Sequence, residues 1–219
     1  MSDYKSTKTS YTEDLSVKIL KQLGISVKRN NTTNTTAVDL VTDINGVKID
    51  VQYSQDFETW GDLRFDHISA YSNGEKGKTY SEIDIFKKFE SKNGFKVDKV
   101  GKHYQDDYLD AIIVLFYNKK LEIEDATKDY NPDKVLLVTK EKLLKYVDDN
   151  LEECIKNTKL NDKSKVGDIH GSAFIPIKVS KFNKDKNCYF GTIEELKDKS
   201  EEIKNYLGCK EKDKNNKSL

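Results

Sequence analysis

Residues 47–53 alternate between apolar and polar side chains, a pattern that predicts a strand with two unlike faces. The apolar face would carry Val47, Ile49, Val51 and Tyr53. The polar face would carry Lys48, Asp50 and Gln52. Such a polar face is costly to bury unless its groups bind a partner, so we expect a functional site on this strand.

A second acidic residue, Asp39, lies on the strand predicted just before the turn at residues 43–46. If these two strands form a hairpin, Asp39 comes close to Asp50. Two neighbouring carboxylates repel each other, and a divalent cation is the simplest partner that favours the ionised form of both. The pattern therefore points to a metal site at the hairpin. The alternative is that Asp39 bonds local amides at a strand end and that Gln52 is a satisfied polar residue.

The remaining apolar pattern predicts an α/β fold with a central mixed sheet flanked by helices. The continuous apolar run over residues 109–117 is the best candidate for a central strand, and residues 134–139 are a second buried strand. Helical spacing predicts helices over 10–23, 81–93, 140–157 and 192–207. Ser10 and Glu13 form a capping box for the first helix, and Gly24 ends it. Pro176 suggests that the short strand over 172–177 lies at a sheet edge.

Alternation resumes at residues 62–66, where polar side chains again share one face of a predicted strand. That face would carry Asp62, Arg64 and Asp66, with Leu63 and Phe65 packed below it. Arg64 is the single basic residue among six acidic ones in residues 50–75, whereas residues 76–102 hold eight lysines against four acids. An acidic segment followed by a basic one suits a metal site beside a phosphate track, and an ordinary lysine-rich surface is the alternative.

The length of 219 residues and the absence of a Pro- or Gly-rich linker predict one domain over residues 1–209. Residues 210–219 form a polar tail that we expect to be disordered.

The 38 basic and 38 acidic residues balance, which argues against a protein that coats DNA by charge alone. Three widely spaced cysteines are expected to be reduced, as in a cytoplasmic protein. No apolar run approaches the roughly 20 residues that span a bilayer, so we expect no membrane partner.

Taken together, these residues resemble the PD-(D/E)XK nuclease superfamily over about residues 10–70. Glu13 on the first helix, Asp39 on a strand and the triplet Asp50-Val51-Gln52 on the next strand follow one another in the family's order. The chain departs from the pattern at Gln52, where the family usually has Lys, and no Pro precedes Asp39. The resemblance implies a restriction-endonuclease-like core.

The resemblance also implies metal-assisted hydrolysis of phosphodiester bonds in DNA. Asp39, Asp50 and the Val51 carbonyl would hold Mg²⁺, or Mn²⁺ in its place, and the metal would lower the pKa of a bound water. Glu13 and Gln52 would complete the catalytic set. Gln52 would position the water or a phosphate oxygen, because a neutral amide cannot lower a pKa through charge.

Two basic residues are candidates for substrate binding. Lys48 projects from the same predicted face as Asp50, although its ammonium group would also reach solvent at the start of the strand. Arg64 has a planar guanidinium that suits a phosphate or a carboxylate, and a structural salt bridge is the alternative.

Two further functions stay open at this point. Gln52 favours a catalytically inactive nuclease-fold protein that binds nucleic acid or a protein partner, and the balanced charge favours a plain interaction domain. RNA in place of DNA also stays open. A homodimer would suit an enzyme that cuts two strands, but no residue in the sequence marks an interface.

Overall fold

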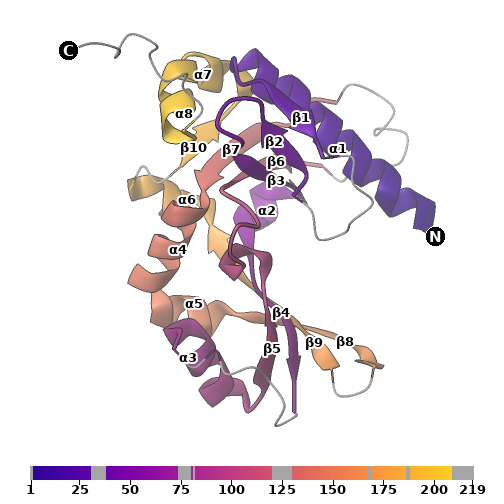
Figure 1. Cartoon of the computed structure of the whole chain (residues 1–219), viewed down its shortest axis with the longest axis vertical. Helices are drawn as coiled ribbons and strands as arrows, with labels where there is room; N and C mark the ends of the chain where they lie inside the picture. Colours follow the sequence, from indigo (N-terminus) through magenta and orange to yellow (C-terminus); the bar gives the residue numbers. More distant parts are fainter. Residues whose placement is uncertain are drawn as a thin grey trace. The chain divides into compact units, whose positions relative to one another are not determined.

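The apolar run over residues 109–117 becomes the central strand of a six-stranded sheet (Figure 1). The computed structural model describes residues 2–30, 38–73, 80, 82–119, 130–166, 169–185 and 188–208. In it, strand β6 (Ala111–Tyr117) is buried along its whole length. The order across the sheet is β1-β2-β3-β6-β7-β10. The other strands are β1 (Val27–Arg29), β2 (Leu40–Thr42), β3 (Lys48–Gln55), β7 (Lys134–Thr139) and β10 (Tyr189–Gly191).

This sheet is mixed, as the sequence predicted. Strand β3 runs parallel to β6, whereas the other neighbouring strands are antiparallel. Strands β2 and β3 form the predicted hairpin, and the turn between them places Asn45 and Gly46 at φ of 62° and 64°. Asn and Gly are the residues that tolerate this left-handed backbone best. The α/β class, with helices flanking a mixed sheet, is therefore confirmed.

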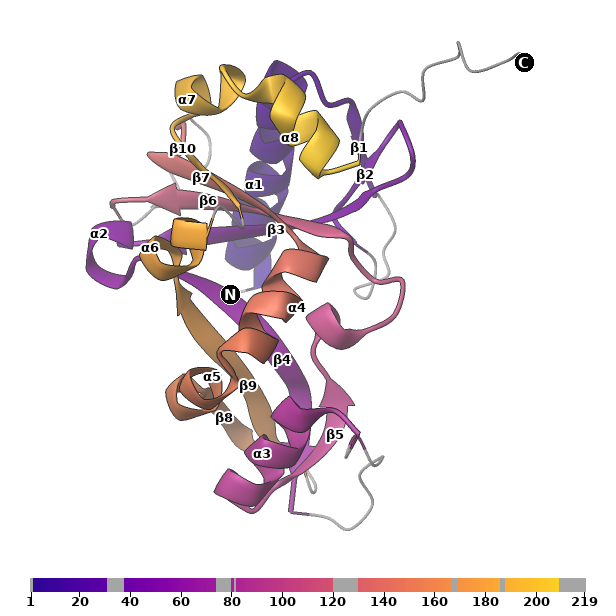
Figure 2. The same cartoon turned by 90° about the vertical axis from the view of Figure 1, so that its left-hand side faces the viewer.

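Helix α1 (Ser2–Gln22) covers one face of the six-stranded sheet. Helices α7 (Ile193–Lys197) and α8 (Ser200–Tyr206) contribute to the same buried cluster, which includes Leu15 and Ile19 of α1, Ile49 of β3, Ile113 of β6 and Leu137 of β7. Figure 2 shows the three helices on one side of the sheet. Gly24 ends the first helix with φ of +72°, as predicted.

Two predicted helix boundaries among these helices are wrong. Helix α1 starts eight residues before Ser10, so Ser10 lies inside the helix and cannot cap it with Glu13. The single helix predicted over 192–207 is two helices, α7 and α8. Thr192, rather than a residue of the apolar stripe, starts α7 with a capping box to Glu195.

The described chain divides into two compact units. The first comprises residues 1–57, 110–139 and 188–219, and the second comprises residues 58–109 and 140–187. Helix α2 (Phe57–Trp60) spans the first boundary. The single domain expected over residues 1–209 stays a prediction. It would be supported if the two units unfolded together. The tail at 210–219 lies outside the described residues.

The second unit is a four-stranded antiparallel sheet with helices on one face. The strand order is β5-β4-β9-β8, formed by β5 (Lys96–Val100), β4 (Asp62–Ser72), β9 (Ile169–Lys178) and β8 (Lys159–Val166). Helices α3 (Asp84–Asn93), α4 (Lys140–Asp149) and α5 (Leu151–Asn157) belong to this unit. Shorter helical segments are α6 (Val179–Phe182), η1 (Lys102–Tyr104) and η3 (Asn183–Asp185).

Two further predictions in this unit need correction. The helix predicted over 140–157 is broken at Asn150, whose φ of −122° and ψ of 32° are not helical. Strand β9 is an inner strand between β4 and β8, not an edge. Pro176 is nevertheless tolerated there because the pairing of β9 with β8 reaches no further than Phe174. On the β8 side, therefore, no paired residue requires the N–H that Pro176 lacks.

Candidate metal and catalytic site

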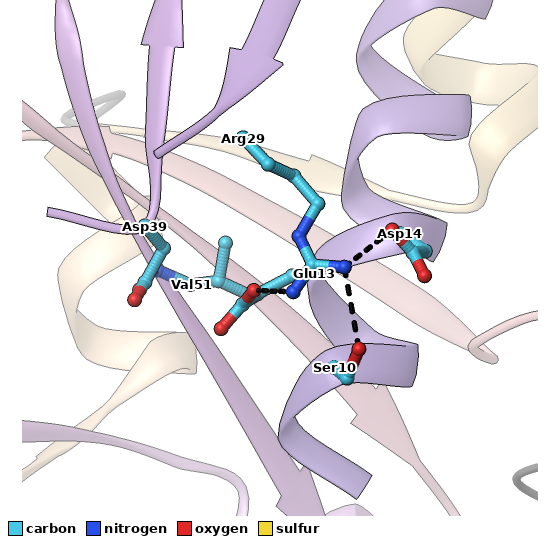
Figure 3. A network of polar contacts seen from close by, with 6 residues as sticks. All are labelled: Ser10, Glu13, Asp14, Arg29, Asp39 and Val51. Atoms are coloured by element: carbon cyan, nitrogen blue, oxygen red, sulfur yellow. Dashed lines mark hydrogen bonds and ion pairs between the residues drawn. The ribbon is translucent and has the colours of Figure 1, made fainter. Parts of the chain in front are cut away.

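The β2–β3 hairpin brings Asp39 to the strand that carries Asp50. Leu40 pairs with Ile49 and Val41 with Lys48, so one further step of the same register places Asp39 opposite Asp50. Asp39 lies just before β2 rather than at its end. Its carboxylate turns along the sheet, where Oδ2 accepts a hydrogen bond from the Val51 backbone N–H at 2.7 Å (Figure 3). The two acidic residues therefore meet at one end of the hairpin.

Asp50 is a buried carboxylate with 4% of its surface exposed. Its Oδ2 accepts a hydrogen bond from the Gln52 side-chain amide at 3.1 Å. The two side chains lie on the same face of β3, as the alternation predicted. Because the amide donates to this carboxylate, Gln52 fixes the orientation of Asp50.

The Val51 carbonyl points toward the β2 side of β3, where the Asp39 carboxylate also lies. At the start of the hairpin, the Thr42 N–H donates to the Val47 carbonyl and the Val47 N–H donates to Thr42 Oγ1, so the backbones of these two residues face each other. Hydrogen-bonded and non-hydrogen-bonded pairs alternate along an antiparallel ladder, so both the N–H and the C=O of Val51 face β2. The Asp39 side chain takes the N–H. The hairpin thus carries two carboxylates and one carbonyl, and hard oxygen ligands of this kind suit Mg²⁺.

Glu13 is bound by Arg29, a residue that the sequence analysis did not single out. Arg29 Nη2 forms an ion pair and hydrogen bond with the Glu13 carboxylate. Its Nη1 donates to Asp14 Oδ1 at 2.8 Å and to Ser10 Oγ at 3.2 Å. Figure 3 shows the guanidinium of Arg29 directed at these three residues of α1. Although burial alone would lower the pKa of Arg29, the Asp14 and Glu13 carboxylates raise it, so the guanidinium is charged.

The structure does not gather Glu13, Asp39 and Asp50 into one cluster. Val51 and Ile49 pack against the apolar residues of α1, so the Asp50 side chain projects from the opposite face of β3. Glu13 belongs to the helix that covers the Val51 face. Within the described ranges, no group of three His, Cys, Asp or Glu residues is placed to hold a metal ion. A catalytic role for Glu13 stays a prediction, and its observed partner is Arg29.

The backbone of Lys48 is fixed where β3 begins. Its N–H donates to Asp110 Oδ2 and its C=O accepts from the Asp110 N–H, both at 2.8 Å. This double contact joins the start of β3 to the entry of β6. Contact between Lys48 and a substrate stays a prediction.

Arg64 lies on β4 of the second unit. Its Nε donates to Asp66 Oδ1 at 2.7 Å, and its Cζ lies 4.2 Å from the centre of the Phe174 ring. The predicted sharing of a face by Asp62, Arg64 and Asp66 agrees with their burial, since Leu63 and Phe65 between them are fully buried. The salt bridge weighed as an alternative for Arg64 is present, and a role in substrate binding stays a prediction.

Two buried histidines, His67 and His103, also belong to the second unit, and their spacing in the sequence gave no signal for them. His103 Nδ1 lies 2.9 Å from the Asp66 carbonyl, and its ring stacks on Phe65. His67 lies edge-on to Phe89. Burial lowers the pKa of His67 to about 3, so this imidazole is neutral at physiological pH.

The described part of the chain contains no helix long and apolar enough to cross a membrane. Cys154 and Cys188 are buried and are not joined in a disulfide in the described part of the chain, and Cys209 lies outside it.

Comparisons with known proteins add little to this geometry. No protein-family model matches the chain, and no curated protein sequence matches it. Among solved structures, the chain is similar to the crystal structure of the restriction endonuclease BglI bound to its DNA recognition sequence. The sequence identity is 9%, the TM-score is 0.35, and the match covers 78% of this chain and 65% of the endonuclease. The chain thus matches slightly less than two thirds of that protein, and a TM-score this low carries no argument about function.

Proposed function

We propose that this protein is a metal-dependent endonuclease that hydrolyses phosphodiester bonds in DNA. The observation that carries the proposal is the register of the β2–β3 hairpin, which places Asp39 opposite the buried Asp50. The order of helix, strand and hairpin is also the order that the resemblance to PD-(D/E)XK nucleases implies. DNA as the substrate, a cytoplasmic location and a homodimer are parts of the proposal that rest on the resemblance and the composition.

Asp39, Asp50 and the Val51 carbonyl would hold Mg²⁺ or Mn²⁺. Mg²⁺ in nucleotide-processing sites is commonly bound by one or two carboxylates together with substrate phosphates and several waters. A pair of carboxylates is therefore sufficient, and a third protein carboxylate is not required. The metal supplies Lewis-acid polarisation of the phosphate and a bound water of lowered pKa.

Gln52 would act through Asp50 in this site. Its amide holds one oxygen of the Asp50 carboxylate, so that the direction of the ligand is set before a metal arrives. Because the amide is neutral, it neither competes with the cation by charge nor activates a water by charge.

The proposal is tested by incubating supercoiled plasmid and single-stranded DNA with the purified protein and Mg²⁺, Mn²⁺ or EDTA. Asp50→Asn keeps the shape of the side chain and removes its charge. We expect cleavage that depends on the metal and falls at least ~100-fold in this variant, equivalent to about 2.7 kcal/mol of transition-state stabilisation.

Asp43→Asn is the matched control, because Asp43 is an exposed carboxylate of the same hairpin that pairs with Lys28. It should cleave like the wild type. Equal cleavage by the wild type and Asp50→Asn, or cleavage that survives EDTA, would remove the proposed site.

A second candidate function is a nuclease-fold protein that binds nucleic acid or a protein partner without chemistry. Two observations favour it: Gln52 replaces the usual lysine, and Arg29 already neutralises Glu13. Calorimetric titration with Mn²⁺ separates the two functions. The endonuclease predicts a binding heat that Asp50→Asn removes, whereas the binding protein predicts no metal affinity in either chain.

A further inference from the structure

One face of the four-stranded sheet in the second unit carries polar and aromatic side chains away from the helices. Helices α3 and α5 lie on the opposite face, where Phe86, Phe89 and Tyr71 are buried (Figure 1, Figure 2). On β4, Arg64 lies opposite Pro176 of β9, and Asp66 lies opposite Phe174. Directly opposed residues share a face of an antiparallel sheet. Arg64, Asp66, Phe174 and Pro176 therefore form one surface, here called the open face.

The centre of the open face is a guanidinium stacked on an aromatic ring. Arg64 Cζ lies 4.2 Å above the Phe174 ring, and Arg64 Nε is held by Asp66 Oδ1 at 2.7 Å. About half of the Arg64 side chain, 51%, is exposed. The guanidinium plane is thus fixed from below by the ring and from one edge by the carboxylate. A flat, charged surface with a set orientation is what a nucleic-acid base can stack on.

The end of the open face carries an exposed aromatic residue. Trp60 is the single tryptophan of the chain, and 59% of it is exposed. Lys178 donates a hydrogen bond from Nζ to the Trp60 carbonyl, and Lys178 itself lies opposite Asp62 on the open face. The Trp60 backbone therefore lies at the Lys178 end of the open face. The exposed indole offers a flat aromatic surface on which a base can stack.

Charge on the open face is nearly balanced at its centre and positive at its margin. Lys159 of β8 lies opposite Phe174 and is exposed. With it, the face carries three basic residues, Arg64, Lys159 and Lys178, against Asp62 and Asp66. Asp66 is paired with Arg64. Burial raises the pKa of Asp62, while the charge of Lys178 lowers it.

We propose that the open face binds single-stranded nucleic acid, with bases stacked on the Arg64–Phe174 pair and on Trp60 and phosphates beside Lys159 and Lys178. A single strand is favoured over a duplex for two reasons. Stacking requires base faces that a duplex hides, and a surface with a net charge of only about +1 is too weakly basic to follow a duplex backbone by charge. This binding does not require metal or cleavage, so it stands independently of the proposed endonuclease activity.

Trp60 provides the assay. An oligothymidine of ~15 nucleotides, within the usual range of site sizes, is titrated into the whole protein in EDTA while tryptophan fluorescence is recorded. We expect quenching of the single tryptophan and a dissociation constant that rises at least ~10-fold in Arg64→Ala/Phe174→Ala, in line with the loss of one or more stacked bases. Both residues are changed together because removal of Arg64 alone would bare the Phe174 ring.

Arg64→Lys/Phe174→Ala distinguishes stacking from charge, since it keeps the positive charge and loses both the planar guanidinium and the ring. It should weaken binding nearly as much as Arg64→Ala/Phe174→Ala. Lys145→Ala is the control, because Lys145 pairs with Asp149 on the exposed side of α4 and lies outside the open face. This variant should bind the oligothymidine with the affinity of the wild type.

Three outcomes would overturn the inference. The first is no quenching and no binding at low salt. The second is wild-type affinity in Arg64→Lys/Phe174→Ala, which would leave charge as the only contribution of this pair. The third is equal affinity for a duplex of the same length, which would mean that exposed base faces are not what the protein binds.

Discussion

His67 is an imidazole enclosed in the second unit, and its burial makes the stability of that unit depend on pH. The pKa of its ring falls from 6.5 to about 3 because burial disfavours the charged form. The Asp66 carboxylate raises this pKa and His103 lowers it, both to a lesser extent. The unfolded chain therefore binds a proton below pH 6.5 that the folded chain does not accept. The contribution of neutral His67 to the free energy of unfolding is therefore complete above pH 6.5 and is lost as the pH falls toward 3.

We therefore expect the free energy of unfolding to decrease between pH 6.5 and 4 by up to about 1.4 kcal/mol per pH unit from this residue. Urea unfolding followed by circular dichroism at several pH values measures the slope. His67→Leu, a variant of similar size that cannot titrate, should flatten the slope in this window even if it lowers stability overall. An unchanged slope in His67→Leu would show that other groups set the acid sensitivity.

At the same scale, the sequence indicated the acidic pair but not its surroundings. Alternation over residues 47–53 was enough to place Asp50 and Gln52 on one face, and the turn at 43–46 was enough to oppose Asp39. Arg29 gave no signal, since it lies on a strand of three residues whose partners are on a helix. Contacts between residues distant in the sequence depend on how α1 is placed on the sheet, and local periodicity does not contain that placement.

Among the elements, β1 and α1 are joined by the polar contacts of Arg29 as well as by apolar packing. Arg29 binds Ser10, Glu13 and Asp14, which occupy one turn of the helix. Glu13 has only 15% of its side chain exposed, so removal of its partner would leave a poorly solvated carboxylate. A bidentate guanidinium also cannot be replaced by the single ammonium group of lysine.

Arg29→Ala should therefore lower the free energy of unfolding by about 1–3 kcal/mol, and Arg29→Lys should recover only part of this loss. Chemical denaturation measures both. Lys145→Ala, which breaks an exposed ion pair between residues four apart, should change stability by no more than about 0.5 kcal/mol. If Arg29→Ala behaved like Lys145→Ala, the Arg29 contacts would contribute nothing to the attachment of the strand.

Element boundaries were harder to predict than element types. The apolar stripe of α1 starts near Leu15, whereas the helix itself extends back to Ser2 through residues without apolar periodicity. The stripe over 140–157 continues through Asn150, although the backbone leaves the helical region there. Hydrophobic periodicity reports the side of an element that is buried. It does not report turns of a helix that extend beyond the core or a break that keeps the same face buried.

For the whole molecule, the two compact units are interleaved along the chain. The chain passes between them after residues 57, 109, 139 and 187. Each unit has its own sheet and its own buried residues. Neither unit can be cut out as one continuous stretch, because each contains segments that flank segments of the other.

We expect the units to unfold together, as a single domain would, because every segment that leaves one unit is anchored in the other. Urea unfolding followed by Trp60 fluorescence reports the second unit, and far-ultraviolet circular dichroism reports both. The two curves should coincide with one midpoint. Separated midpoints would show two independently stable domains.

A ribosome makes this chain from the N-terminus, and the interleaving sets the order in which its sheets can be completed. Strand β7 ends at Thr139, but its outer neighbour β10 begins only at Tyr189. While residues 140–187 are added, roughly 2–10 s at usual rates of synthesis, one edge of β7 has no partner strand from this chain. That edge is formed by Val135, Leu136 and Leu137. An apolar edge of this kind pairs readily with other extended chains, so the interval before β10 emerges is the stage of synthesis at which aggregation is most favoured.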